Sequence, residues 1–315
     1  MVAHPSHELR IHGWLQLARP HVYVFTDGSG RAGGPRLQST TKVLEDVGAK
    51  RGSVYGRCTD TQVYDALLKK DFSFFIDIAD ELAEEFIRNE IEYVVGDADE
   101  GYTPAHEVCR LLTNAAVEIS GRRSKRQIAN FEFAVVGSPE ECPAAVRDQA
   151  IWVHLDDEAF SRKISAARDF NSKLALDIEA ALRGEPFKGA GHFSEPELAA
   201  EVDKDLTTKT PAALPAHPDL ERESKDVFDG IELGRFRVEC LRPVAKPAAN
   251  TAEANKSPFY ELYGDKMVAA GHYQTTIRYA EHFLPLAEAV WRHVSAVGDQ
   301  KSEVRGQKSE VRDQK

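Results

Sequence analysis

Two hydrophobic patterns alternate along the first 140 residues. Apolar side chains recur at helical spacing in some segments, and β-prone residues run together in shorter ones. The pattern predicts helices over residues 7–18, 36–47, 71–89 and 104–119, and strands over residues 21–25, 53–55, 91–95 and 131–136. Because strands that alternate with helices pair in parallel and are covered by them, we expect an α/β fold with a Rossmann-like, mostly parallel sheet flanked by helices.

After residue 140 the pattern loosens. Helical spacing returns over residues 159–182 and 279–294, a strand-like run covers residues 235–241, and residues 188–218 are rich in Gly, Pro, Ala and Thr. We therefore expect a core over 1–140 and an extension over 141–297 that completes the domain with helical and irregular additions. Within it, residues 188–218 are expected to be flexible. Residues 298–315 repeat every seven residues with one valine per repeat, too few apolar positions for a coiled coil, so a disordered tail is expected.

The N-terminus is short for this fold. A parallel sheet would place an apolar strand before His4, yet only three residues precede it. Either this strand is very short, or the chain starts upstream of Met1.

Composition narrows the class of protein. Of the 315 residues 42% are hydrophobic and 29% charged, which is ordinary for a globular protein, and the net charge of −11 argues against binding a phosphate backbone. The chain has no apolar run near the ~18 residues that span a bilayer, no signal-peptide pattern at its N-terminus, and no closely spaced pair among its four cysteines. We expect a reduced, cytoplasmic protein without nucleic-acid or membrane partners, and the pattern leaves a homo-oligomer open.

Three histidines are the candidate metal ligands. His4 and His7 form an H-x-x-H pair, and His106 begins a later predicted helix. Histidine is the commonest protein ligand of zinc, and three protein ligands plus a water make a catalytic zinc site. In parallel sheets ligands collect beyond the carboxyl ends of the strands, so these histidines and the acids that follow strands are expected at one edge. Those acids are Asp27, Asp97 and Glu100.

Three motifs carry a resemblance to a known family. The segment AHPSHE at residues 3–8 resembles the Ala-His-Pro-Asp-Asp-Glu signature of the PIG-L/LmbE-like metal-dependent deacetylases. The segment FTDG at residues 25–28 is similar to that family's Thr-Asp-Gly strand end, and GYTPAH at residues 101–106 to its second metal motif, Gly-His-Pro-Asp-His. The motifs occur in the family's order and cover roughly residues 2–120.

This resemblance implies roles for individual residues. His4 and His106 would hold Zn²⁺ or another divalent metal, and His7 stands where the family has an aspartate ligand. Ser6 stands where the family has its general base, and a serine hydroxyl cannot take a proton from water near neutral pH. Another carboxylate would have to do so.

The candidates for that base are Asp97, Glu100 and Asp27, with Glu8 beside them. Arg36 would bind substrate or form a structural ion pair. The implied activity is zinc-dependent removal of an N-acyl group from an amino sugar or a related small molecule. The alternative is a non-catalytic metal-binding or ligand-binding homologue that has lost the base.

A glycine-rich segment and an aromatic segment each allow more than one interpretation. The glycines of residues 28–33 match G-x-G-x-x-G, the dinucleotide fingerprint, but Pro35 places the next helix too late for a phosphate to meet its N-terminus. A flexible loop at the edge of the site explains them better. The aromatic residues of 258–264 either pack in the core or a subunit contact, or offer faces to a sugar ring.

Overall fold

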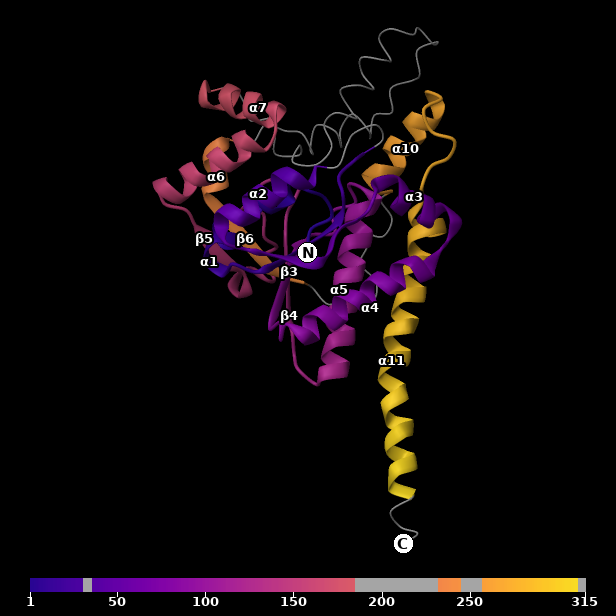
Figure 1. Ribbon diagram of the computed structural model, residues 1–315. Helices are drawn as coiled ribbons and strands as arrows, with labels where there is room; N and C mark the ends of the chain where they lie inside the picture. Colours follow the sequence, from indigo (N-terminus) through magenta and orange to yellow (C-terminus); the bar gives the residue numbers. More distant parts are fainter. Residues whose placement is uncertain (31–35, 185–231, 245–256, 311–315) are drawn as a thin grey trace.

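Parallel strand pairs organise the N-terminal half of the protein (Figure 1). The computed structural model describes residues 1–30, 36–184, 232–244 and 257–310. Strand β1 (His21–Thr26) pairs in parallel with β2 (Lys50–Cys58), and β3 (Tyr93–Asp97) pairs in parallel with β4 (Ala129–Phe133). The expected α/β class is therefore confirmed, and β2 extends beyond the short strand predicted there.

The C-terminal strands make the second sheet mixed. Strand β6 (Val238–Pro243) pairs antiparallel with both β4 and β5 (Ile151–His154), which gives the order β3-β4-β6-β5. Strand β6 was predicted from the sequence, but β5 and the antiparallel pairing were not. A four-residue strand carries little periodic signal, and the direction in which two strands pair depends on residues far apart in the chain.

Residues 1–3 lie between the two sheets. The Val2 N–H donates to the Tyr23 carbonyl at 2.9 Å, and the Phe25 N–H donates to the Val2 carbonyl at 2.9 Å. On the other side the Met1 amine donates to the Val95 carbonyl at 2.7 Å. Gly96 permits this close approach, because a Cβ there would lie 2.8 Å from the Met1 carbonyl oxygen. The first three residues thus act as a very short strand between β1 and β3.

Helices cover both faces of these strands. The helices are α1 (His12–Ala18), α2 (Leu37–Val47), α3 (Asp60–Lys69), α4 (Phe72–Arg88), α5 (Pro104–Ser124), α6 (Asp157–Phe170), α7 (Ser172–Leu182), α10 (Phe259–Ala269) and α11 (Leu284–Glu310). Short helical turns cover His7–Ile11, Arg147–Gln149, Leu233–Arg237 and Tyr279–Phe283. Figure 1 shows α4, α5 and α11 running together along one flank.

Alternate residues of β1 face two different apolar clusters. Tyr23 and Phe25 join the cluster formed with α3, α4, α5 and α11, and Val22 and Val24 join the cluster formed with α1 and α2. Because successive strand residues point to opposite faces, a strand buried on both sides must be apolar throughout. This is the reason why residues 21–25 read as a continuous β-prone run.

The predicted helix over residues 159–182 is two helices. Asn171 separates α6 from α7, and its Oδ1 accepts the Leu174 N–H at 2.8 Å. Asparagine at a helix start satisfies a backbone donor that the helix itself cannot, so the chain restarts there.

Two expectations concern the C-terminal half. The structure continues α11 through Glu310, so residues 298–310 are helical where a disordered tail was expected. Their Glu, Lys, Gln and Arg residues are good helix formers, which outweighs the missing apolar seam. The segment 188–218, expected to be flexible, lies outside the described residues, as do residues 311–315.

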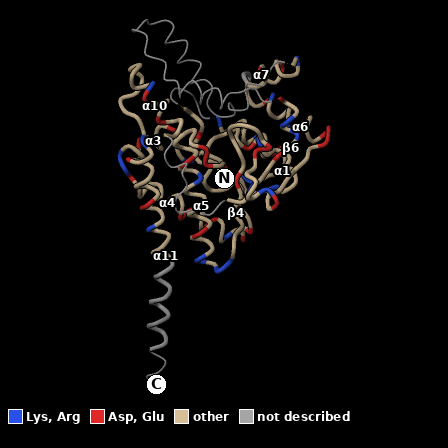
Figure 2. Tube along the Cα trace, turned by 180° about the vertical axis from the view of Figure 1, so that it is seen from behind, with Lys and Arg blue, Asp and Glu red and all other residues tan. Residues whose placement is uncertain are grey.

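The distribution of charged residues and the character of the helices can be compared with what the composition predicts. Lys and Arg positions and Asp and Glu positions are interspersed over the described part of the trace in Figure 2. Within that part, no helix combines the length and the apolar character that crossing a bilayer requires.

A buried ion pair joins β6 to the N-terminal helical region. The Glu239 carboxylate, 1% exposed, accepts the N–H groups of Gly13 and Trp14, each at 2.8 Å. The Lys163 ammonium donates to Glu239 at 2.8 Å and to the Arg10 carbonyl at 2.8 Å. These contacts tie β6 and α6 to the start of α1.

Replacing Glu239 by alanine should therefore destabilise the fold strongly. The change leaves the Lys163 ammonium buried without a counter-charge, which typically costs about 3–5 kcal/mol in the free energy of unfolding. Urea denaturation measures this value. Asp169→Ala, which breaks the exposed Lys42–Asp169 pair, is the control and should cost less than about 1 kcal/mol. Equal losses in both variants would contradict the role given to Glu239.

Candidate metal centre

The three predicted histidines meet in the interior. Their ring centroids are 5.3 Å apart for His4 and His7, 5.3 Å for His4 and His106, and 4.7 Å for His7 and His106. All three residues are 0% exposed. The expectation that these side chains converge is confirmed.

A sharp turn and a helix cap aim these rings. Ser6 has a φ of 94°, a left-handed conformation that turns the chain from the short strand into the helical turn that begins at His7. Thr103 precedes α5, its Oγ1 accepts the His106 N–H at 3.3 Å, and Pro104 occupies the first helical position. The Thr-Pro sequence fixes where α5 begins and hence where the His106 side chain starts.

Two acids orient the first two histidines. The Nδ1 of His7 lies 2.6 Å from Asp97 Oδ2. The Nδ1 of His4 lies 2.7 Å from Thr26 Oγ1 and 3.1 Å from Asp60 Oδ1. Histidines that bind metals usually donate their second ring N–H to a carboxylate, which leaves Nε2 for the ion. His4 and His7 therefore present the arrangement that such ligands need.

Asp60 is a partner of the cluster that the sequence did not predict. This residue is the first of α3 and follows Thr59, whose side chain caps that helix. An acid just after a strand end and a helix cap was the available signal, because such residues lie at the carboxyl edge where ligands collect.

The electrostatics of the cluster favour neutral imidazoles at His7 and His106 beside ionised acids. Burial lowers the pKa of His7, and burial together with the two neighbouring imidazoles lowers that of His106 well below its usual value. Burial alone would raise the pKa of Asp97, but its charge interaction and hydrogen bond with His7 outweigh this and lower it to about 2. His4 likewise holds the pKa of Asp60 below its ordinary value, against the effect of burial. Neutral imidazole is the form that binds metal.

Several polar atoms of the cluster have no hydrogen-bond partner within the described structure. They are Nε2 of His7, both ring nitrogens of His106, and Oδ1 of Asp97. One ligand atom each from His7, Asp97 and His106 lie within 4.8 Å of one another. A buried polar group without a partner costs about 1–3 kcal/mol, so a cation that these atoms can share would remove the cost. The residues present therefore fit a divalent metal.

The three acids predicted as catalytic have different surroundings. Asp97 touches His7 and also accepts the Ala3 N–H at 2.8 Å. Asp27, at the end of β1, accepts the Ser29 N–H at 2.9 Å. Glu100 accepts the N–H groups of the two residues after Ala134, at 2.9 and 3.0 Å, and desolvation raises its pKa to about 8. Of the three, only Asp97 is brought into contact with the histidines by these hydrogen bonds.

Arg36 lies beside the cluster. Its Nε donates to the Gly28 carbonyl at 2.6 Å, and its charge contributes to the low pKa of His7. The Gly30 N–H donates to Asp60 Oδ2 at 2.6 Å, so this part of the glycine loop is bound to the acid that orients His4. Residues 31–35 of the loop lie outside the described residues.

The aromatic residues near the C-terminus approach the same region. Tyr102 lies 6.0 Å from the His106 ring, Phe259 stacks on Tyr102 at 5.3 Å, and Tyr263 stacks on Phe259 at 6.1 Å. Phe259 and Tyr263 of α10 thus form, together with Tyr102, a row of aromatic rings that ends at the histidine cluster.

Comparison with known proteins finds no relative. No family model matches the chain, and no curated protein and no solved structure matches it.

Proposed function

We propose that this protein is a zinc-dependent hydrolase that removes an N-acyl group from an amino sugar or a related small molecule. The observation that carries the proposal is the convergence of three buried imidazoles, two of which have an acidic partner on the Nδ1 side. The resemblance of residues 3–8 and 101–106 to the deacetylase motifs supplies the reaction class.

The ligand set would be His4, His7 and His106. A divalent ion held there would polarise an amide carbonyl and lower the pKa of a water ligand. Asp60 and Asp97 keep the His4 and His7 rings in place, as the partners of metal ligands do. Arg36 adds positive charge near His7 that suits an anionic group of the substrate.

The aromatic rings beside His106 pack on one another. Phe259 is stacked between Tyr102 and Tyr263, and Tyr102 is buried, so these rings form a wall beside the histidines.

A second candidate is a metal-binding protein without hydrolytic activity. The observation that favours it is Ser6, which stands at the position of the general base. The four acids named as candidates each accept a hydrogen bond elsewhere. Asp97 binds His7 and Ala3, and Asp27 binds Ser29. Glu100 binds the backbone after β4, and Glu8 accepts the Ser6 N–H at 2.8 Å. The two candidates share the metal centre and differ in turnover.

The metal centre itself is tested by metal content. His4→Ala and His106→Ala should each lose most of the zinc that the unaltered protein retains after dialysis, because two imidazoles cannot replace a three-ligand site. Plasma emission spectrometry measures the stoichiometry, and circular dichroism confirms that each variant folds. His293→Ala is the control, since His293 pairs with Asp80 outside the cluster. Unchanged zinc in both variants would refute the site.

The orienting acids are tested by metal affinity. Asp97→Asn and Asp60→Asn should weaken zinc binding by about 10–100-fold, because the imidazoles lose the charged partner that fixes their orientation. Competition with a chromophoric chelator measures the dissociation constant. Asp65→Asn, which alters only the exposed Asp65–Lys69 pair, should leave it unchanged. Equal affinities in all variants would mean that the acids do not support the ligands.

The hydrolase is separated from the non-catalytic protein by turnover and by Ser6→Asp. Zinc-loaded protein should release acetate from at least one N-acetylated amino sugar in a panel. Ser6→Asp, which aspartate's tolerance of left-handed backbone permits, should raise that rate by about 10²-fold if the position serves a base, and Ser6→Asn should not. No release by the unaltered protein, together with release by Ser6→Asp, would establish the non-catalytic candidate.

A further inference from the structure

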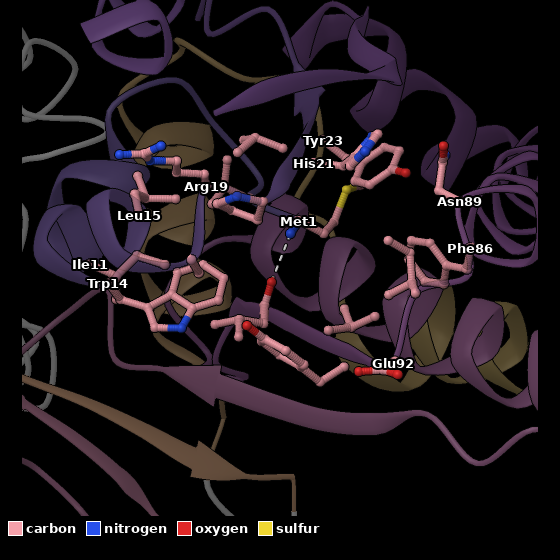
Figure 3. A pocket seen from close by; sticks show the side chains of 18 of the residues that line it. Met1, Ile11, Trp14, Leu15, Arg19, His21, Tyr23, Phe86, Asn89 and Glu92 are labelled. Atoms are coloured by element: carbon pink, nitrogen blue, oxygen red, sulfur yellow. Dashed lines mark hydrogen bonds between the residues drawn. The ribbon is translucent and has the colours of Figure 1, made fainter. Parts of the chain in front are cut away.

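A cavity of about 310 Å³ lies between β1 and β3, away from the histidine cluster (Figure 3). It begins where the short strand formed by residues 1–3 ends, and Met1 forms its inner wall. In Figure 3, Trp14 and Leu15 lie on one side of Met1, and Tyr23 and Phe86 lie on the other. The cavity therefore occupies the space that would continue the path of residues 1–3.

The backbone register shows what this space faces. In a parallel ladder, the N–H and C=O of one residue point to the same neighbour, and successive residues alternate between the two neighbours. Val2 pairs with β1 through Tyr23 and Phe25, and Met1 pairs with β3 through Val95. The same alternation directs the Tyr23 N–H and the His21 carbonyl of β1 into the cavity.

The edge of β3 presents backbone groups that are complementary to those of β1. Residues 92, 94 and 96 of the β3 segment face β4, since the Ala129 N–H donates to the Glu92 carbonyl and the two strands stay in register. The Val95 N–H and the Tyr93 carbonyl therefore face the cavity. The edges of β1 and β3 thus present backbone donors and acceptors to each other. The gap between them has the width of one strand, which would lie about 4.8 Å from each edge.

The side-chain environment is apolar on both faces. Val2 points into the cluster that contains Trp14, Leu15 and Val22, and Met1 points into the cluster that contains Tyr23, Phe86 and Val94. A residue joined before Met1 would point with Val2, and the one before that would point with Met1. An occupant must therefore be apolar on both faces.

The buried Met1 amine also favours a residue joined to its nitrogen. The amine is buried against the Val95 carbonyl, and desolvation lowers its pKa to about 6. A peptide bond at this nitrogen would keep the N–H that donates to Val95 and would replace an ionisable amine whose charged form is costly in an apolar interior.

We propose that this cavity is a binding surface for one extended apolar segment, joined to the Met1 nitrogen and running parallel to β1 and β3. Roughly three residues at ~3.3 Å each bring such a segment level with Tyr93 and with the start of β1. The residue next to Met1 pairs with His21 and Tyr23, and the residue before it pairs with Tyr93 and Val95. The segment joins the two sheets into one continuous sheet. This inference is independent of the metal centre and its chemistry.

The test adds four residues before Met1 in the full-length chain. One extension is threonine-valine-isoleucine-valine, and the matched control is serine-glycine-serine-glycine. The apolar extension should raise the thermal midpoint of unfolding by roughly 5–10 °C above that of the control, as expected for burying two or three apolar side chains. A third extension, with aspartate in place of the valine next to Met1, should lose this gain, because that side chain faces Trp14 and Leu15.

Hydrogen exchange gives the second measurement. The amides of Tyr23 and Val95 should become protected by at least 10-fold in the apolar extension relative to the glycine-serine control. Equal midpoints and equal exchange in the apolar and control extensions would overturn the proposal. So would a concentration-dependent dimer of the unextended chain that protects the same two amides, because the occupant would then be a second copy.

Discussion

The backbone hydrogen bonds of residues 1–3 determine the position of the candidate site. Val2 pairs with β1 while Met1 and Ala3 reach β3, so this short segment is fixed from both sides. His4 follows this segment directly, and His7 comes after the turn at Ser6. Metal ligands must be held within about half an ångström of their working geometry, and a loose chain end could not do so. The candidate metal centre therefore depends on the pairing of residues 1–3 with β1 and β3, although its three histidines lie outside these strands.

The charges of the cluster explain why its residues tolerate complete burial. The pKa values of Asp60 and Asp97 lie below the ordinary range, while burial lowers those of His7 and His106. These directions favour ionised carboxylates beside neutral imidazoles at His7 and His106. An uncompensated double negative charge in the interior is expensive, and a divalent cation among the rings would balance it. Electrostatics and ligand geometry favour the same occupant.

Much of this arrangement could be predicted from sequence, and the remainder depends on contacts between distant residues. The alternation of strands and helices placed His106 at the start of a helix and His4 beside a strand end, which is enough to bring them to one edge. Nothing local marks Asp60 as the partner of His4, or Glu239 as the partner of Gly13, because each pair forms only in the folded chain. The partner of Glu100 was equally hidden in the sequence. Glu100 follows a strand as expected, but it binds the backbone after β4.

Asp60 has a consequence for how the edge of the site can move. One carboxylate oxygen lies against His4, and the other accepts the N–H of Gly30 in the glycine loop. A displacement of that loop therefore either breaks a charge-assisted hydrogen bond or pulls on the acid that steadies a metal ligand. Loop position and ligand orientation are thus mechanically linked through one side chain. A change in the position of Gly30 would therefore also disturb the His4 ring.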